Sequence, residues 1–155
     1  MNKTTGLFVL MMLLILFSAS TARADVHPGI RGGAYIEASG AFLGGELLMD
    51  IGPRNWFFNP NFEYCWGDKR NVASFNFDFH YDVPTTSSFY LWIGGGPAVV
   101  IFDPKNQFVK TDTDPGLNLF MGIGFNKGGH ITPYIQPKVL ISDHSDFVLT
   151  FGVRF

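Results

Sequence analysis

The stretch that decides the fold is Asp146-Phe147-Val148-Leu149-Thr150-Phe151-Gly152-Val153-Arg154-Phe155. Large apolar side chains recur at every second position, and Val148, Thr150, Gly152 and Arg154 stand between them. A period of two places these two sets on opposite faces of a β-strand. The stretch has the length of one membrane-crossing β-strand, about 9–11 residues. A half-buried edge strand of a soluble β-sandwich would alternate in the same way. This stretch alone therefore does not distinguish a membrane strand from a soluble one.

The first 24 residues have the pattern of a secretory signal peptide. Lys3 supplies the positive charge, Gly6–Phe17 is a short apolar core, and Ala22-Arg23-Ala24 is a small-x-small cleavage pattern. We therefore expect cleavage after Ala24 and one domain over residues 25–155. No later apolar run has the length of a membrane-spanning helix. Membrane residence would thus require a closed β-barrel, because open sheets leave backbone polar groups unpaired in lipid.

Composition narrows the classes of function. Removal of Lys3 and Arg23 with the signal peptide changes the formal charge from −2 to −4, so no basic surface for nucleic acid is expected. Cys65 is the single cysteine, which excludes an intramolecular disulfide framework. The chain has 17 Phe, which is more than a soluble domain of this size needs but typical of lipid-facing surfaces.

Alternating segments bounded by turn residues follow one another to the end of the chain. They are Ile30–Ser39, Phe42–Ile51, Trp56–Trp66, Ser74–Tyr81, Ser88–Phe102, Leu117–Phe125, Ile131–Ile141 and Asp146–Phe155. The fourth is the most diagnostic, because Phe75, Phe77, Phe79 and Tyr81 alternate with polar residues, a pattern that a helix would scatter around its circumference. The sequence predicts an all-β, eight-stranded antiparallel up-and-down transmembrane β-barrel, with its longest loop at Asp103–Gly116.

The apolar face of these segments is expected to point outward. It carries no Asp, Glu, Lys or Arg, whereas the opposite face is rich in Gly, Asn and Gln, which suit a narrow interior. The alternative is a soluble, lipocalin-like periplasmic carrier, whose aromatic face would line a cavity for an apolar ligand. Pro60, Pro97 and Pro137 lie inside strands, where each removes a hydrogen-bond donor, so we expect β-bulges at these positions.

The inward face supplies the candidate site. We expect a plugged, hydrogen-bonded lumen of structural character, because buried charges without partners are costly and an eight-stranded barrel is filled by its own side chains. The same residues could instead line a narrow cation-preferring pore. Its charged members are four carboxylates and two cations: Glu37, Glu46, Glu63, Asp78, Lys138 and Arg154.

A catalytic role is the least favoured alternative. Lipid A-modifying barrels have a His and a Ser two residues apart, but His144 and Ser145 are adjacent here and would point to opposite faces of a strand. The remaining histidines have no metal-ligand spacing, and Gly94–Gly96 is followed by Pro97 and further strand rather than a helix. We expect no catalytic residue, cofactor site or metal site.

From Asp25 onward the chain resembles the opacity-like and OmpA-transmembrane-like families of small β-barrels in Gram-negative outer membranes, whose last strand also alternates and ends in Phe. The resemblance implies a cell outer membrane location, lipid as the surrounding medium and a monomer. It also implies that Phe151, Val153 and Phe155 form a signal for the barrel assembly machinery. Those families are mostly structural or adhesive. A surface partner could bind the Asp103–Gly116 loop, although a solvated loop is the simpler interpretation.

Overall fold

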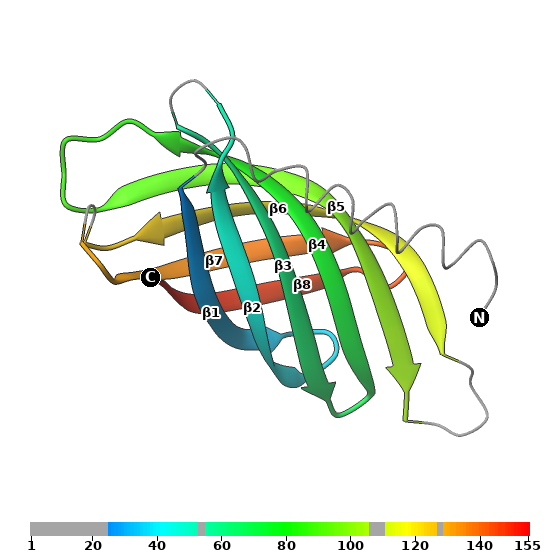
Figure 1. Ribbon diagram of the computed structural model, residues 1–155. Helices are drawn as coiled ribbons and strands as arrows, with labels where there is room; N and C mark the ends of the chain where they lie inside the picture. The colour runs from blue at the N-terminus through cyan, green and yellow to red at the C-terminus, as the bar shows by residue number, and fades with distance from the viewer. Residues whose placement is uncertain (1–24, 53–54, 106–110, 127–128) are drawn as a thin grey trace.

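The computed structural model describes residues 25–52, 55–105, 111–126 and 129–155, which form a closed antiparallel barrel (Figure 1). Each strand pairs with its neighbours in sequence, and the first strand pairs with the last. The predicted eight-stranded up-and-down barrel is therefore confirmed. The strands are β1 (Val26–Tyr35), β2 (Gly40–Asp50), β3 (Trp56–Gly67), β4 (Arg70–Val83), β5 (Tyr90–Pro104), β6 (Asp112–Gly124), β7 (Thr132–Ile141) and β8 (Asp146–Arg154). Among the described residues, no helix is long and apolar enough to cross a membrane. The predicted signal peptide, residues 1–24, lies outside the described residues.

The barrel has two distinct ends. β1 begins and β8 ends at the same end, which we call the terminal end. The turns that follow β1, β3, β5 and β7 lie at the opposite end, which we call the distal end. Because successive strands are antiparallel, the turns of the chain alternate between the terminal end and the distal end.

The stagger of the strands fixes the width of the barrel. A circuit of paired residues that starts at Val26 ends at Ile36, the residue directly after β1, ten residues further along the chain. The circuit passes through Met49, Phe58, Phe79, Gly95, Leu119, Val139 and Phe147. Eight strands with this stagger tilt by roughly 35–45° from the barrel axis and enclose a lumen that side chains can fill.

The expectation of β-bulges at the three strand prolines is wrong. Each described pair of strands keeps a single register along its length, including the stretches on both sides of Pro60, Pro97 and Pro137. The ladder is interrupted next to each proline on one side only, since proline has no N–H to donate. On the other side the pairing continues with Phe77, Leu117 and Leu149 respectively.

Two predicted boundaries also change. The first strand begins at Val26 and ends at Tyr35, so that residues 36–39 form a turn rather than the end of a strand. Both ends of the predicted loop Asp103–Gly116 are strand, because β5 extends to Pro104 and β6 starts at Asp112. The backbones of β5 and β6 stay paired beyond the apolar part of their hairpin. The sequence there no longer alternates between apolar and polar residues, so the pattern did not predict strand. Residues 106–110 lie outside the described residues.

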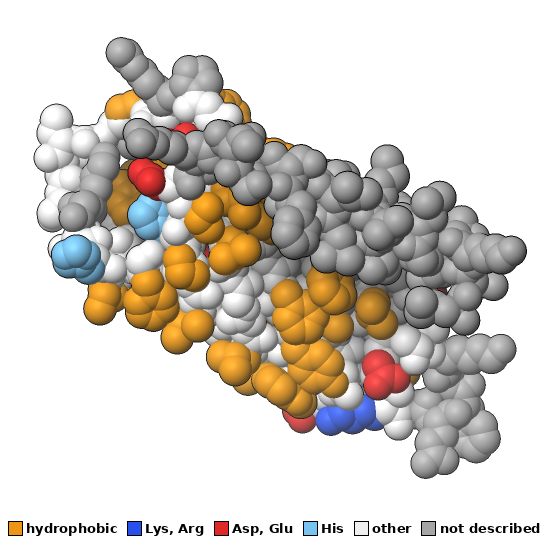
Figure 2. Space-filling view, viewed as in Figure 1, with side chains coloured by type: hydrophobic (Ala, Val, Ile, Leu, Met, Phe, Trp, Pro, Cys, Tyr) orange, Lys and Arg blue, Asp and Glu red, His pale blue; other side chains and the backbone are white. Residues whose placement is uncertain are grey.

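The polarity of the barrel is inverted relative to a soluble domain. Leu43, Ile93 and Met121 on the outer wall are 61%, 58% and 59% exposed, whereas Glu63 and Asn118 inside are 0% exposed. Figure 2 shows hydrophobic side chains across much of the visible outer wall between the ends of the barrel. The lipocalin-like alternative required the aromatic face inside, and the structure places it outside.

Inward-facing glycines make room for large aromatic rings on neighbouring strands. A Cβ atom at Gly122 would overlap the Trp92 indole, and one at Gly152 would overlap the Tyr134 ring. Trp92 and Tyr134 are 1% and 2% exposed, so neither ring can swing out into solvent. Gly122 and Gly152 are therefore packing sites for the interior, as expected for small residues in a narrow barrel.

We predict that Gly122→Ala lowers the free energy of unfolding by about 1–3 kcal/mol, because the added methyl group overpacks against Trp92. The measurement is urea unfolding of the barrel in lipid vesicles. Gly45→Ala is the matched control, because a Cβ there has its nearest neighbour at 3.8 Å, the carbonyl oxygen of Gly29. Equal stability of the two variants would contradict the packing role.

Candidate functional site

The lumen is filled by three groups of side chains. The aromatic layer near the terminal end consists of Tyr90, Trp92, Phe120 and Tyr134. The distal plug is an apolar cluster of Tyr35, Ala38, Phe42, Cys65, Val72, Ala98, Val100, Phe102, Leu140 and Val148. Between them runs the ion network, whose charged members are Arg31, Glu46, Glu63, Asp78, Lys138 and Arg154, all buried. This arrangement places the charges between the two apolar groups, and Arg154 also lines a hollow at the terminal end.

The ion network alternates in sign along its length. Arg154 Nε lies 2.9 Å from Glu46 Oε1, and Arg31 Nη1 lies 3.4 Å from Glu46 Oε2. Arg31 Nη2 is 3.1 Å from Glu63 Oε1, and Lys138 Nζ is 2.8 Å from Glu63 Oε2. Glu46 and Glu63 therefore each stand between two cations. Such pairing offsets the large desolvation penalty that an isolated charge would carry in the interior.

Asp78 is held by amides instead of cations. Asn61 Nδ2 and Asn118 Nδ2 donate hydrogen bonds to its two carboxylate oxygens at 2.9 and 2.8 Å. Asn76 links this cradle, since it donates to Asn61 and accepts from Asn118 at 2.9 and 2.8 Å. Charge-assisted hydrogen bonds of this kind are stronger than neutral ones. The buried charges of the ion network then balance, with three carboxylates and three cations.

Five of the six predicted lumen residues lie inside the barrel and close together, and one does not. The prediction that Glu37 lines the lumen is wrong: its side chain is exposed, because β1 ends at Tyr35 and the turn of residues 36–39 breaks the alternation. Sequence reasoning also missed Arg31 as a lumen cation, although it lies on the inward face of β1 and is 2% exposed. The predicted lumen had four carboxylates but only two cations, and this imbalance was the signal that a buried cation was missing.

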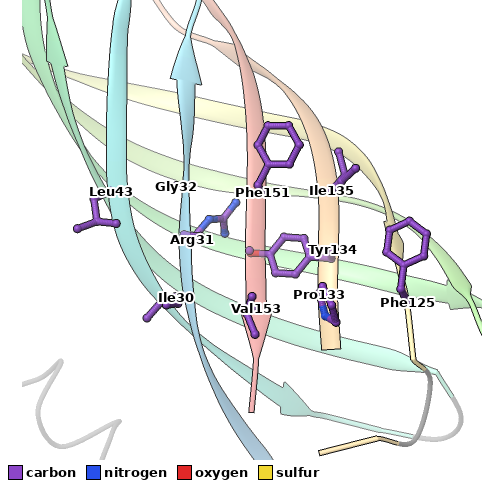
Figure 3. Close-up of a pocket in the computed structure, with 11 residues that line it drawn as sticks. Ile30, Arg31, Gly32, Leu43, Phe125, Pro133, Tyr134, Ile135, Phe151 and Val153 are labelled. Carbon is purple, nitrogen blue, oxygen red and sulfur yellow. The ribbon is translucent and has the colours of Figure 1, made fainter. Parts of the chain in front are cut away.

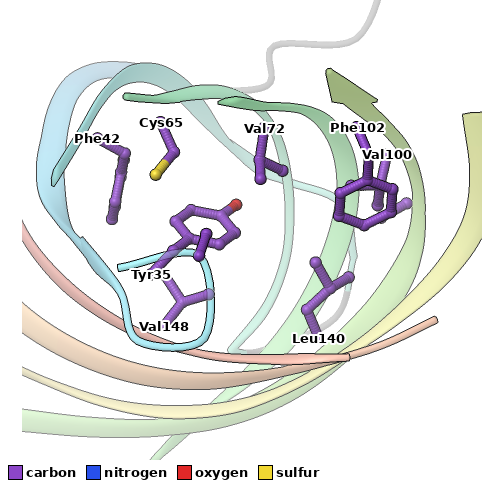
Figure 4. Packing of buried hydrophobic residues seen from close by; sticks show 10 residues of the cluster. Tyr35, Phe42, Cys65, Val72, Val100, Phe102, Leu140 and Val148 are labelled. Atoms are coloured by element: carbon purple, nitrogen blue, oxygen red, sulfur yellow. The ribbon is translucent and has the colours of Figure 1, made fainter. Parts of the chain in front are cut away.

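The distal plug is closed by a turn that folds inward. Asp146 accepts hydrogen bonds from the backbone N–H groups of Glu37 and Ala38 at 2.8 and 3.0 Å, which ties the β1–β2 turn to β8. Ala38 is 0% exposed as a result. Figure 4 shows Tyr35 in the middle of the plug, with Cys65 beside it. The hydroxyl of Tyr35 also donates to Glu63 Oε2 at 2.5 Å, so the plug and the ion network are directly joined.

The aromatic layer is joined to the network in a similar way. The Arg154 guanidinium lies over the rings of Trp92 and Tyr134, at 5.0 and 4.5 Å from their centroids. Trp92 Nε1 donates to Gln136 Oε1 at 2.9 Å. Cation–π contacts in such a desolvated position can reach about 2 kcal/mol. One arginine therefore pairs with a carboxylate and packs against two rings of the aromatic layer.

No catalytic relay is formed at the His144–Ser145 pair. His144 Nδ1 lies 3.2 Å from Asp114 Oδ2, and the centroid of its ring lies 4.8 Å from that of Phe102, with the two ring planes tilted by 51°. The Ser145 hydroxyl instead donates to the carbonyl of Ser142 at 2.9 Å within the β7–β8 turn. Within the part of the chain that the structure describes, no group of His, Cys, Asp and Glu side chains could hold a metal ion.

The residues of the predicted assembly signal lie on the outer wall or at its edge. Phe151 and Phe155 are 52% and 51% exposed, and Val153 is half-buried. The Phe155 N–H donates to the carbonyl of Pro28 at 2.9 Å, beyond the last paired residue of β8. Their recognition by the assembly machinery stays a prediction.

Comparison with known proteins supports the fold. No protein-family model and no curated protein sequence matches the chain. The structure is similar to the N-terminal β-barrel domain of Pseudomonas aeruginosa OprF, with a TM-score of 0.69 and 13% identity over 84% of this chain and 95% of that one. It is also similar to Neisserial surface protein A, with a TM-score of 0.61 and 14% identity over 83% of this chain and 92% of that one. The chain has the fold of the small eight-stranded outer-membrane β-barrels.

We predict that Lys138→Met lowers the free energy of unfolding by about 3–5 kcal/mol, because Glu63 loses a buried partner. Urea unfolding in lipid vesicles measures the loss. Adding Glu63→Gln should recover part of it, since the uncompensated charge is then removed. Lys69→Met is the control, because Lys69 is exposed and its Nζ donates to the backbone carbonyl of Glu37 instead of a buried carboxylate. A loss no larger than that of Lys69→Met would contradict the role of the ion network.

Proposed function

We propose that this chain is an integral outer-membrane protein with a filled lumen and a structural or surface-interaction role. The inverted polarity of the barrel is the observation that carries the proposal. Large apolar side chains are exposed on every strand, for example Ile30, Leu43, Phe62, Phe75, Ile93, Leu119, Val139 and Phe151. A soluble monomer rarely exposes so extensive an apolar surface, whereas a closed barrel in lipid requires one.

Aromatic residues at both rims agree with this placement. Trp56 and Phe125 are exposed near the terminal end, and Trp66 and Phe147 are exposed near the distal end. Trp and other aromatic side chains favour the two membrane–water interfaces. With an even number of strands and both strand termini at one end, the terminal end would face the periplasm and the distal end the exterior.

The filled lumen favours a structural or surface role over transport. A cation-preferring pore would need a continuous polar path, but the distal plug and the aromatic layer lie at either side of the ion network. A surface role is supported by the similarity to Neisserial surface protein A, whose name places it at a surface. The β5–β6 hairpin at the distal end, with exposed Asp103 and Asp112, is where a surface partner would bind.

The partners that this proposal assigns are few. Outer-membrane lipid covers the apolar wall, and the barrel assembly machinery recognises the last strand. The protein acts as a monomer and binds no nucleic acid, in keeping with its mildly acidic composition. The catalytic alternative has no support in the arrangement of His144 and Ser145.

We expect the protein in the outer-membrane fraction of a Gram-negative cell, with a gel mobility that shifts on boiling. The shift arises because a closed barrel resists detergent until heat breaks its hydrogen-bonded wall. The same purified material should give no steady conductance steps in a planar bilayer. Recovery in the soluble periplasmic fraction without a shift would contradict membrane residence, and steady conductance steps would contradict the filled lumen.

A further inference from the structure

The outer wall of the barrel has a hollow of about 460 Å³ where β8 meets β1 (Figure 3). Its sides are the outward side chains of Ile30, Leu43, Phe151 and Val153, and Gly32 lies between them. Three of these side chains, those of Ile30, Leu43 and Phe151, are more than half exposed, so they project from the wall around a residue that has no side chain. The volume lies within the range of about 300–1,000 Å³ that is usual for small-molecule sites.

The hollow lies toward the terminal end. Its remaining wall includes Phe125, which directly follows β6, and Pro133, the second residue of β7. Both positions are close to the terminal rim of the barrel. If the barrel is oriented as proposed above, the hollow opens into the leaflet that faces the periplasm, and this inference rests on that proposed function.

The chemistry of the lining selects an apolar, flexible occupant. Every outward side chain around the hollow is aliphatic or aromatic, and along the hollow β8 is paired with β1 on one side and with β7 on the other. A peptide segment or polar ligand would find no hydrogen-bond partner there and would leave its own polar groups unpaired. The hollow is also continuous with the apolar belt that surrounds it, so a chain in the membrane can enter it from the side.

We propose that the hollow is a binding site for one acyl chain of a phospholipid. A flexible hydrocarbon chain can follow the floor at Gly32 and touch the surrounding side chains, which an empty hollow would leave without contacts. Lipid tails are as apolar as leucine, so the site holds its lipid through packing and not through a hydrophobic driving force. A second barrel is a poorer fit, because a standard protein interface buries about 1,200–2,000 Å² and the hollow covers only one seam of the wall.

The test counts phospholipids that stay bound after extraction. The barrel is reconstituted into vesicles of palmitoyl-oleoyl-phosphatidylethanolamine and phosphatidylglycerol, extracted in mild detergent and examined by native mass spectrometry. We expect one phospholipid on the unaltered barrel. Gly32→Leu fills the hollow and should reduce the retained fraction by about fivefold, because the acyl chain loses its packing surface. Gly45→Leu is the matched control and should retain the lipid, since Gly45 is also outward but lies outside the hollow.

A second pair of variants covers the case in which Gly32→Leu fails to fold. Leu43→Ala removes one side of the hollow and should also reduce retention, whereas Leu47→Ala, on the same strand outside the hollow, should not. Equal retention in all variants, no retained phospholipid, or a barrel dimer in place of a lipid adduct would each overturn the proposal. Failure of the barrel to enter vesicles, seen as the absence of a heat-dependent mobility shift, would instead overturn the proposed function.

Discussion

Closure of the sheet by the pairing of β1 with β8 is the constraint on which the rest of the structure depends. In hydrocarbon, a backbone N–H or C=O group has no water to bond with, so an open edge would be untenable. Closure with eight strands and a stagger of ten residues fixes a narrow lumen. The same closure turns the alternation of each strand into an inside and an outside, so a single geometric requirement sets the environment of every side chain in the wall.

The narrow lumen limits which side chains can lie inside the barrel and which neighbours each of them needs. Trp92 fits because a glycine, Gly122, stands opposite its ring. Charges fit only in compensating sets, and the chain of ion pairs from Arg154 to Lys138 achieves this without access to bulk water. The two ends of the network are each joined to an apolar layer, through Tyr35 at one end and Arg154 at the other. The lumen thus behaves as a packed core made largely of polar groups.

Alternation alone predicted the strand count, the topology and the inward position of Glu46, Glu63, Asp78, Lys138 and Arg154, because a period of two is a local property of the chain. The prediction from alternation failed where the alternation of apolar and polar residues ends. Glu37 was assigned to the lumen because the sequence does not clearly mark the turn after Tyr35. Asp103–Gly116 was predicted to be a loop because it lacks alternating apolar residues, although backbone hydrogen bonds between strands can form without them. The ion pairs and the outer hollow depend on the register between strands, which a single sequence does not contain.

The three tryptophans test the inverted polarity of the barrel most directly. Trp56 and Trp66 are 48% and 57% exposed on the outer wall, whereas Trp92 is 1% exposed in the lumen. Three single-tryptophan variants, with Phe at the other two positions, would be reconstituted into vesicles that contain phospholipids brominated on the acyl chains. The account predicts strong quenching of Trp56 and Trp66 fluorescence and almost none for Trp92. Quenching of Trp92 as strong as that of the other two would contradict it.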